Sequence, residues 1–195
     1  AGLLVDDSFW LAGLGAVLWD LQRGQSGLGL ADPVGADLNA VSLVLFHVSD
    51  LHFGYEDRAA LEWFMAEVER DQPAAVLCTG DLTMRGTARE FALARDWLTA
   101  LTVPVTLEPG NHDVPYYWYP LARAFHPWRH YDALAATVES DLALPDLAVV
   151  PLRTVAAAQW RLNWSKGRVG NRDLDEALND LERHRARPLK LVTCH

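Results

Sequence analysis

Three apolar runs alternate with two amphipathic segments between residues 43 and 107, and this alternation constrains the fold more than any other feature of the sequence. The runs cover residues 43–48, 74–78 and 103–107, and apolar runs of this length are typical of buried strands. Strands that alternate with helices are joined by right-handed crossovers and form a mostly parallel sheet covered by helices. We therefore predict an α/β fold.

The two segments between the runs carry the signals of helices. Asp57 can cap the first helix, in which apolar residues recur at helical spacing: Leu61, Phe64, Met65 and Val68. Thr87 and Glu90 form a capping-box pattern at the start of the second helix. Its predicted buried face holds Phe91, Ala94, Leu98 and Leu101.

The C-terminal part of the chain predicts a second sheet. Residues 147–152 and 154–158 are predicted short strands, and residues 189–193 form a final strand that delivers His195. Residues 171–184 form a predicted helix that buries Leu174, Leu178 and Leu181. We expect His184 to support the C-terminus of that helix.

Residues 1–40 differ in composition from the rest of the chain. Residues 8–19 are apolar but far fewer than the roughly 20 residues of a membrane span, and acidic rather than basic residues precede them. Residues 22–40 are rich in Gly and Asp, which is typical of a linker. We predict a leader helix and a flexible linker over residues 1–40, either an upstream extension or a functional arm, and one domain over residues 41–195.

The net charge and the cysteine content restrict which binding partners and which cellular compartment we expect. The formal net charge of -9 argues against a surface that tracks duplex phosphates, so we do not expect nucleic acid as a partner. Two cysteines cannot form a disulfide framework, and Cys78 lies inside an apolar run, where a small buried thiol is ordinary. We expect a cytoplasmic protein without a membrane span.

Polar residues that can bind metal ions follow the predicted strands. The candidate ligands are Asp50, His52, Asp81, Asn111 and His195. Because ligands of parallel sheets collect at the carboxyl ends of the strands, these side chains should converge. Their oxygen and nitrogen atoms suit Mn, Fe or Zn better than Ca, and the lack of a cysteine pair argues against structural zinc.

Asp81 follows the central strand, and its two oxygens allow it to bridge two ions. Two ions roughly 3.5 to 4 Å apart can activate a bridging hydroxide and neutralise the leaving oxygen of a phosphoryl displacement. The residues therefore predict a dinuclear, metal-dependent hydrolase of phosphate esters.

The motifs carry a resemblance to a known family. Asp50-x-His52, Gly80-Asp81, Gly110-Asn111-His112-Asp113 and His195 resemble, in order and spacing, the signature blocks of the calcineurin-like metallophosphoesterases. The longer strings Ser-Asp-Leu-His-Phe-Gly at residues 49–54 and Gly-Asp-Leu-Thr-Met-Arg-Gly-Thr at residues 80–87 are most similar to the class III cyclic-nucleotide phosphodiesterase branch.

The resemblance implies a four-layer sandwich, in which two packed β-sheets are flanked by helices, and a small phosphoester or phosphodiester substrate. It implies that Asp50 and His52 hold the first metal, that Asn111 and His195 hold the second, and that Asp81 joins them. A further set of implications concerns catalysis: His112 faces the leaving group, as a general acid or as a stabiliser of charge, and Asp113 orients its ring.

The chemistry of an imidazole agrees with this role of His112, because the ring can supply either a proton or a positive charge near neutral pH. Two alternatives stay open: a non-catalytic scaffold that keeps the fold and binds a protein partner, and a nuclease of the same superfamily. Metal content would separate the scaffold from an enzyme.

Two features depart from the family pattern. Many relatives have an acidic residue where this chain has Met84, so that Arg85 is either a substrate-binding residue or an exposed loop arginine. Family members also continue into a Gly-His-x-His block, which is absent after His195, while His126 and His130 have neither the spacing nor the strand context to replace it. We therefore expect a catalytic domain that is incomplete at its C-terminus. Either the chain is a piece of a longer protein, which we favour, or a second polypeptide supplies the missing strands and histidines. The isolated domain should associate through its exposed sheet edge.

Residues 115–128 are crowded with aromatic side chains and prolines. They either wall a pocket that could stack a flat group or fill the core, and we favour the core. His47 lies on the strand face opposite Asp50 and is likewise predicted to be a core residue.

Overall fold

The computed structural model describes residues 43–116, 118–142, 144–156 and 167–195. The leader and linker predicted for residues 1–40 lie outside these residues, as does the end of the strand predicted at 154–158. Within the described chain, none of the helices is long and apolar enough to cross a membrane.

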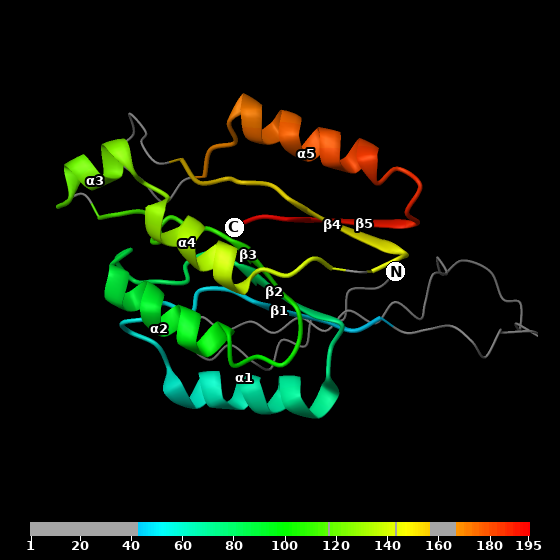
Figure 1. Cartoon of the computed structure of the whole chain (residues 1–195), viewed down its shortest axis with the longest axis horizontal. Coiled ribbons are helices and arrows are strands. Elements are labelled where there is room, and N and C mark those ends of the chain that lie inside the picture. Colours follow the sequence, from blue (N-terminus) through cyan, green and yellow to red (C-terminus); the bar gives the residue numbers. More distant parts are fainter. Residues whose placement is uncertain (1–42, 117, 143, 157–166) are drawn as a thin grey trace, which may run out of the picture.

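Three parallel strands form the first sheet, in the order β1 (Leu45–Val48), β2 (Ala75–Thr79) and β3 (Val105–Glu108) (Figure 1). Every residue of the central strand β2 is buried. Leu45 on β1 pairs with Ala75 on β2, and this register aligns the carboxyl ends of the two strands. The predicted parallel sheet is confirmed, with strand ends that shift by one or two residues.

Two capped helices connect these strands, as the sequence predicts. Asp57 accepts hydrogen bonds from the first-turn amides of α1 (Arg58–Asp71), and α2 (Ala88–Leu98) begins with a complete capping box of Thr87 and Glu90. The buried apolar residues of the two helices are Leu61, Phe64 and Val68 in α1 and Phe91, Ala94 and Leu98 in α2.

The second sheet consists of β4 (Leu147–Pro151) and β5 (Leu189–Thr193), which pair in parallel. Leu147 of β4 packs against β1 and β2, so the two sheets lie face to face. The other face of the first sheet packs against α1, α2 and α4 (Arg129–Val138), whereas α5 (Asn171–Arg183) covers the second sheet (Figure 1). The result is the predicted four-layer arrangement of helices, sheet, sheet and helix.

Several local predictions are wrong. Leu174 and Leu178 of α5 are 44% and 53% exposed, and the residue that α5 buries is Ala177. Leu181, the third predicted residue of this face, is partly buried and packs against the cluster that contains Ala148 and Val150 of β4. Residues 154–156 form no strand, while α3 (Pro120–Phe125) and α4 are helices that the sequence analysis did not predict.

Candidate active site

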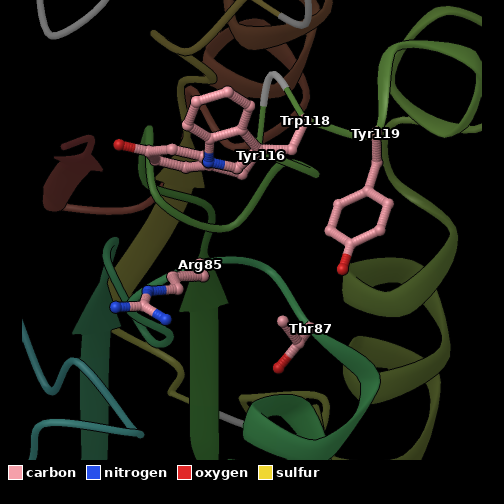
Figure 2. A pocket seen from close by; sticks show the side chains of 5 residues that line it. All are labelled: Arg85, Thr87, Tyr116, Trp118 and Tyr119. Carbon is pink, nitrogen blue, oxygen red and sulfur yellow. The ribbon is translucent and has the colours of Figure 1, made fainter.

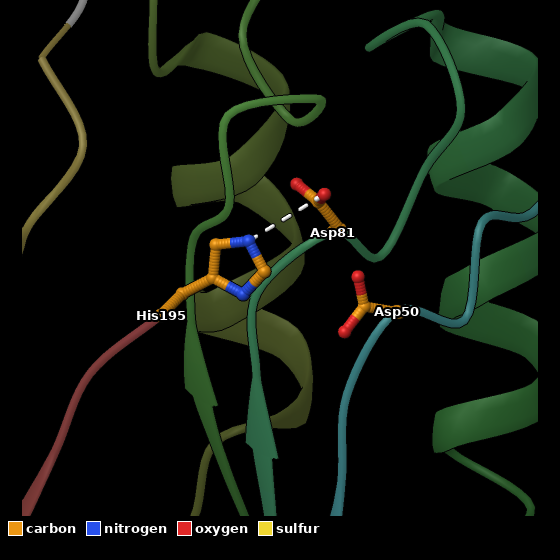
Figure 3. Close-up of side chains that lie close together, drawn as sticks. All are labelled: Asp50, Asp81 and His195. Carbon is orange, nitrogen blue, oxygen red and sulfur yellow. Dashed lines mark ion pairs between the residues drawn. The ribbon is translucent and has the colours of Figure 1, made fainter. Parts of the chain in front are cut away.

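The side chains of Asp50, Asp81 and His195 converge at the carboxyl ends of the strands (Figure 3). Each offers one potential ligand atom, and these atoms all lie within 4.8 Å of one another. His195 Nε2 lies 3.5 Å from Asp81 Oδ2, and His52 Nε2 lies 4.0 Å from the same oxygen and 3.6 Å from Asp50 Oδ1. Asp81 is therefore the carboxylate that both imidazoles share.

The backbone at these residues is held in an unusual conformation. Asp50, His52 and Asp81 have φ angles of 57°, 47° and 50°, in the left-handed region that non-glycine residues rarely adopt. The amide of Asp50 donates to the Gly80 carbonyl, and the amide of His52 donates to the Asp81 carbonyl at 2.9 Å. Strained residues that hold one another in this way cluster at functional sites.

Two glycines make the convergence possible. A Cβ atom at Gly80, whose φ is +74°, would lie 2.1 Å from the Cγ atom of His195. A Cβ atom at Gly110 would lie 2.0 Å from the backbone nitrogen of Asp81. Both distances are far below contact, so a side chain at either position would displace a site residue.

The electrostatics of the cluster favour carboxylates beside protonated imidazoles. The hydrogen bond with Asp81 raises the pKa of His195 to about 9, and the contact with Asp50 raises the pKa of His52. The same contact with His52 lowers the pKa of Asp50. At Asp81, burial opposes ionisation, but hydrogen bonds from His195 and from the His112 amide keep its pKa below the ordinary value. A divalent cation would replace these protons, so the donor set fits a transition-metal ion.

The loop after β3 places Asn111 and His112 next to this cluster. The backbone amide of His112 donates to Asp81 Oδ1 at 2.9 Å, and the ring of His112 lies edge-on to that of His52, with 4.9 Å between centroids. Asn111 is half-buried in the same turn. His112 Nδ1 lies 2.7 Å from the carbonyl oxygen of Met84. Because that oxygen can only accept, the contact requires the proton on Nδ1.

Asp113 is almost fully buried, and its contacts differ from those implied by the family resemblance. Its carboxylate accepts hydrogen bonds from the amides of Leu82, Thr83 and Gly110 and from the Thr83 hydroxyl. Burial raises the pKa of its carboxyl to about 6. The described contacts of Asp113 thus join the loop after β2 to the loop after β3, while the described contacts of the His112 ring are with the Met84 carbonyl and the His52 ring. Sequence reasoning missed both Thr83 and the Met84 carbonyl.

Arg85 is exposed and forms part of the wall of a pocket of about 420 Å³. The other residues that line this pocket are Thr87, Tyr116, Trp118 and Tyr119 (Figure 2). Arg85 Nη2 lies 3.3 Å from the hydroxyl of Tyr55. Our preference for a core role of residues 115–128 is wrong for Trp118, Tyr119 and Phe125, which are 72%, 60% and 71% exposed.

Two other histidines lie outside the cluster. His47 is half-buried with Nε2 2.6 Å from the Thr79 hydroxyl, and burial lowers its pKa, as expected of a residue in the core. His184 stands at the C-terminal cap of α5, where its amide bonds the carbonyls of Asp180 and Glu182.

Comparison with known proteins gives one family and several partial relatives. Residues 43–194 match the family model described as calcineurin-like phosphoesterase. The glycerophosphodiester phosphodiesterase GpdQ of Enterobacter lignolyticus (strain SCF1) is 35% identical over 82 residues, which cover 36% of this chain and 30% of that protein. A probable cyclic nucleotide phosphodiesterase of Synechococcus sp. is 28% identical over 86 residues, which cover 40% of this chain and 34% of that protein.

The matched regions thus span about a third of the length of both curated relatives. Among solved structures, the nuclease MPE of Pseudomonas putida aligns with 64% of this chain and 72% of its own, at 19% identity and a TM-score of 0.29.

Proposed function

Because the chain belongs to the calcineurin-like phosphoesterase family, we propose that it is a metal-dependent phosphodiesterase acting on a small phosphodiester. The observation that carries the proposal is the convergence of Asp50, Asp81 and His195 at the carboxyl ends of the strands. Both curated relatives are named as phosphodiesterases, which supports a diester rather than a monoester as the substrate.

The proposed centre is dinuclear. Asp50 and His52 would hold one ion, Asn111 and His195 the other, and Asp81 would bridge them. The proximity of Asp81 Oδ2 to both imidazoles supports its bridging role. Mn, Fe or Zn suits such a mixture of carboxylate, amide and imidazole donors. When bound, the two ions lower the pKa of a water molecule and neutralise charge at the reacting phosphoryl group.

His112 is proposed as the general acid at the departing oxygen. The Nδ1 proton of His112 is directed at the Met84 carbonyl. The second proton of the imidazolium therefore lies on Nε2, and His112 can donate this proton to the departing oxygen. The contact also fixes the orientation of the ring. Asp113 supports this geometry indirectly, because it fixes the turn from Gly110 onward that carries His112.

The test is hydrolysis of bis-p-nitrophenyl phosphate by the purified protein, with Mn, Fe or Zn added after chelation. We expect turnover that depends on the metal and that is lost in the Asp81→Asn variant. Asp71→Asn, an equally conservative change at the exposed end of α1, is the matched control and should retain full activity. Wild-type turnover by Asp81→Asn would refute the proposed centre.

A further inference from the structure

Helix α3 and the residues just before it carry a patch of exposed apolar side chains. The patch consists of Trp118, Tyr119, Leu121 and Phe125, which all keep most of their surface exposed, and we call it the α3 patch. None of the six described residues of α3 is buried. Figure 1 shows α3 at the edge of the molecule, on the outer side of α4 and away from both sheets. The patch is therefore accessible to another molecule or to a surface.

The α3 patch is held in place by the chain that carries it. The amide of Arg123 donates to the Tyr119 carbonyl at 3.0 Å, and Arg123 Nη1 donates to the Pro115 carbonyl at 2.7 Å. Leu121 and Phe125 are four residues apart in α3, so they lie on the same face of the helix. Apolar side chains that are held together in water mark an interaction site when polar groups surround them.

The stretch around the patch is positively charged in a protein that is otherwise acidic. Residues 114–131 contain Arg123 and Arg129 and no acidic residue, although the formal net charge of the chain is -9. The acidic residues that bound this stretch are Asp113, which is buried, and Asp132 in the first turn of α4. The local charge of the stretch is thus opposite in sign to that of the whole chain.

Arg85 adds a further positive charge beside the patch. It is exposed and lines the same pocket as Trp118 and Tyr119, and Figure 2 shows it across this pocket from Trp118. The described contacts of its guanidinium are with Tyr55, whose hydroxyl lies 3.3 Å from Nη2 and whose ring centroid lies 5.6 Å from Cζ. A guanidinium that is held by an aromatic residue rather than a carboxylate can still pair with a phosphate.

This combination of groups matches the surface of an anionic phospholipid membrane. Trp and Tyr concentrate at the boundary between water and lipid, where the ring is in apolar surroundings and its polar atom faces water. Leu and Phe side chains enter the acyl boundary, and arginine is attracted to anionic lipids. The net charge of -9 does not prevent the contact, because charges more than about 10 Å away are largely screened at physiological salt.

We propose that the α3 patch docks the protein on the surface of an anionic phospholipid membrane. The four side chains of the patch enter the interface, and Arg85 and Arg129 pair with lipid phosphates. Arg129 is exposed and lies four residues after Phe125, a stretch that spans at most about 14 Å. The docking is independent of the proposed phosphodiesterase function, because the protein can bind a membrane without any turnover.

The first experiment measures cosedimentation of the purified protein with vesicles. Vesicles of equal parts phosphatidylglycerol and phosphatidylcholine should bind the wild type about tenfold more tightly than vesicles of phosphatidylcholine alone. The double variant Leu121→Ser with Phe125→Ser should bind the mixed vesicles at least about tenfold more weakly, because burial of each of these side chains in an apolar medium has an effect of this order. Absence of binding by the wild type would overturn the proposal.

A matched double variant assigns the loss of binding to the α3 patch. Leu174→Ser with Leu178→Ser makes the same kind of change, at the same spacing, on the exposed face of α5 and should bind vesicles like the wild type. Because the substituted positions in both helices are exposed, neither double variant should prevent folding. Wild-type binding by Leu121→Ser with Phe125→Ser would refute the proposal and would point to another segment of the chain as the membrane contact.

The second experiment tests the part that positive charge plays. Arg85→Gln with Arg129→Gln should lose most of the preference for phosphatidylglycerol, and wild-type binding should weaken as NaCl is added. Arg58→Gln with Arg172→Gln removes two exposed charges outside the patch and should keep the preference. A full preference in Arg85→Gln with Arg129→Gln would contradict the proposed pairing with lipid phosphates.

Analytical ultracentrifugation without lipid separates the membrane from a second copy of the chain as the partner of the patch. We expect the wild type and the variant Leu121→Ser with Phe125→Ser to sediment alike. A wild-type dimer that this variant splits into monomers would show that a second copy covers the patch, and the proposal would then be wrong.

Discussion

The hydroxyl of Thr193 donates a hydrogen bond of 3.0 Å to the carboxylate of Glu108, and this contact joins β5 of the second sheet to β3 of the first. Both residues are buried. Burial raises the pKa of Glu108 to about 7, and the negative charge of Glu139 adds to this rise. The hydrogen bond from Thr193 and the positive charge of Arg153 lower the pKa of Glu108 and so oppose the rise. The junction between the sheets therefore contains a carboxyl group that resists ionisation.

The stability of the fold should consequently fall as the pH rises through the interval from 4.5 to about 7. The unfolded chain releases the Glu108 proton near the ordinary pKa, whereas the folded chain retains it up to about pH 7, so the folded state binds more protons in this interval. Glu108→Gln can still accept from Thr193 and has no proton to lose.

Urea unfolding at pH 5 and pH 8 checks this prediction. The wild type should lose up to about 3 kcal/mol more than Glu108→Gln between the two pH values. Glu62→Gln, at an exposed position of α1, should follow the wild type. Parallel pH curves for the wild type and Glu108→Gln would contradict the prediction.

Gly110→Ala should disrupt the candidate site, because its added Cβ atom would collide with the backbone and side chain of Asp81. The new Cβ atom would lie 2.0 Å from the Asp81 nitrogen and 2.1 Å from Asp81 Oδ1, so the loop after β2 must move. Overpacking of this kind costs about 1–3 kcal/mol or more. We expect a lower Tm and at least tenfold weaker Mn binding, measured by calorimetry.

Gly170→Ala is the control for this substitution. Its Cβ atom would lie 2.6 Å from an oxygen at the end of the Asp173 side chain, which can rotate away, so Tm should fall little and Mn binding should not change. If Gly110→Ala bound Mn with the affinity of the wild type, the close approach of Gly110 to Asp81 would not be what positions the Asp81 carboxylate.

The sequence allowed part of the site to be predicted because a parallel sheet brings strand ends together. Asp50, Asp81 and His112 follow consecutive strands, so their convergence needs only the topology. His195 is different, because it arrives from β5 and its position depends on the packing of Leu147 against the first sheet. That packing involves residues distant in sequence and was predicted only through the family resemblance.

The wrong predictions arose where residue type does not determine environment. An aromatic side chain such as Trp118 serves equally well in a core or in a pocket wall, and only the path of the loop decides between them. The sequence analysis did not predict α4, although its buried residues Tyr131, Leu134 and Val138 recur at helical spacing. The contact of His112 with Met84 uses a backbone carbonyl, which no residue pattern reveals.

Asp113→Asn should reduce stability, because Asp113 accepts four hydrogen bonds from two loops. An asparagine amide presents hydrogens to some of these donors, and unpaired buried groups cost about 1–3 kcal/mol each. Thermal unfolding should show a clear decrease in Tm, while Asp141→Asn, at an exposed position, should show none. An unchanged Tm combined with a shifted pH profile of kcat would instead favour direct orientation of the His112 ring by Asp113.

His112→Ala and Asp81→Asn should separate catalysis from metal binding. Excess Mn at about 100 times its Kd should stabilise the wild type by about 2.7 kcal/mol, because it binds only the folded state. His112→Ala should keep this Mn-dependent increase in Tm, since the ring contacts Met84 and packs edge-on to His52, yet lose turnover by about 10²–10⁴-fold.

Asp81→Asn should lose both the Mn-dependent increase in Tm and turnover, because its carboxylate is the one shared by His52 and His195. Differential scanning fluorimetry with and without Mn, run beside the phosphodiester assay, gives both readouts for each variant. Loss of the Mn effect in His112→Ala would place His112 among the metal ligands and would rule out its assignment as a general acid. If Mn stabilises neither the wild type nor any variant, the fold acts as a scaffold without a metal centre.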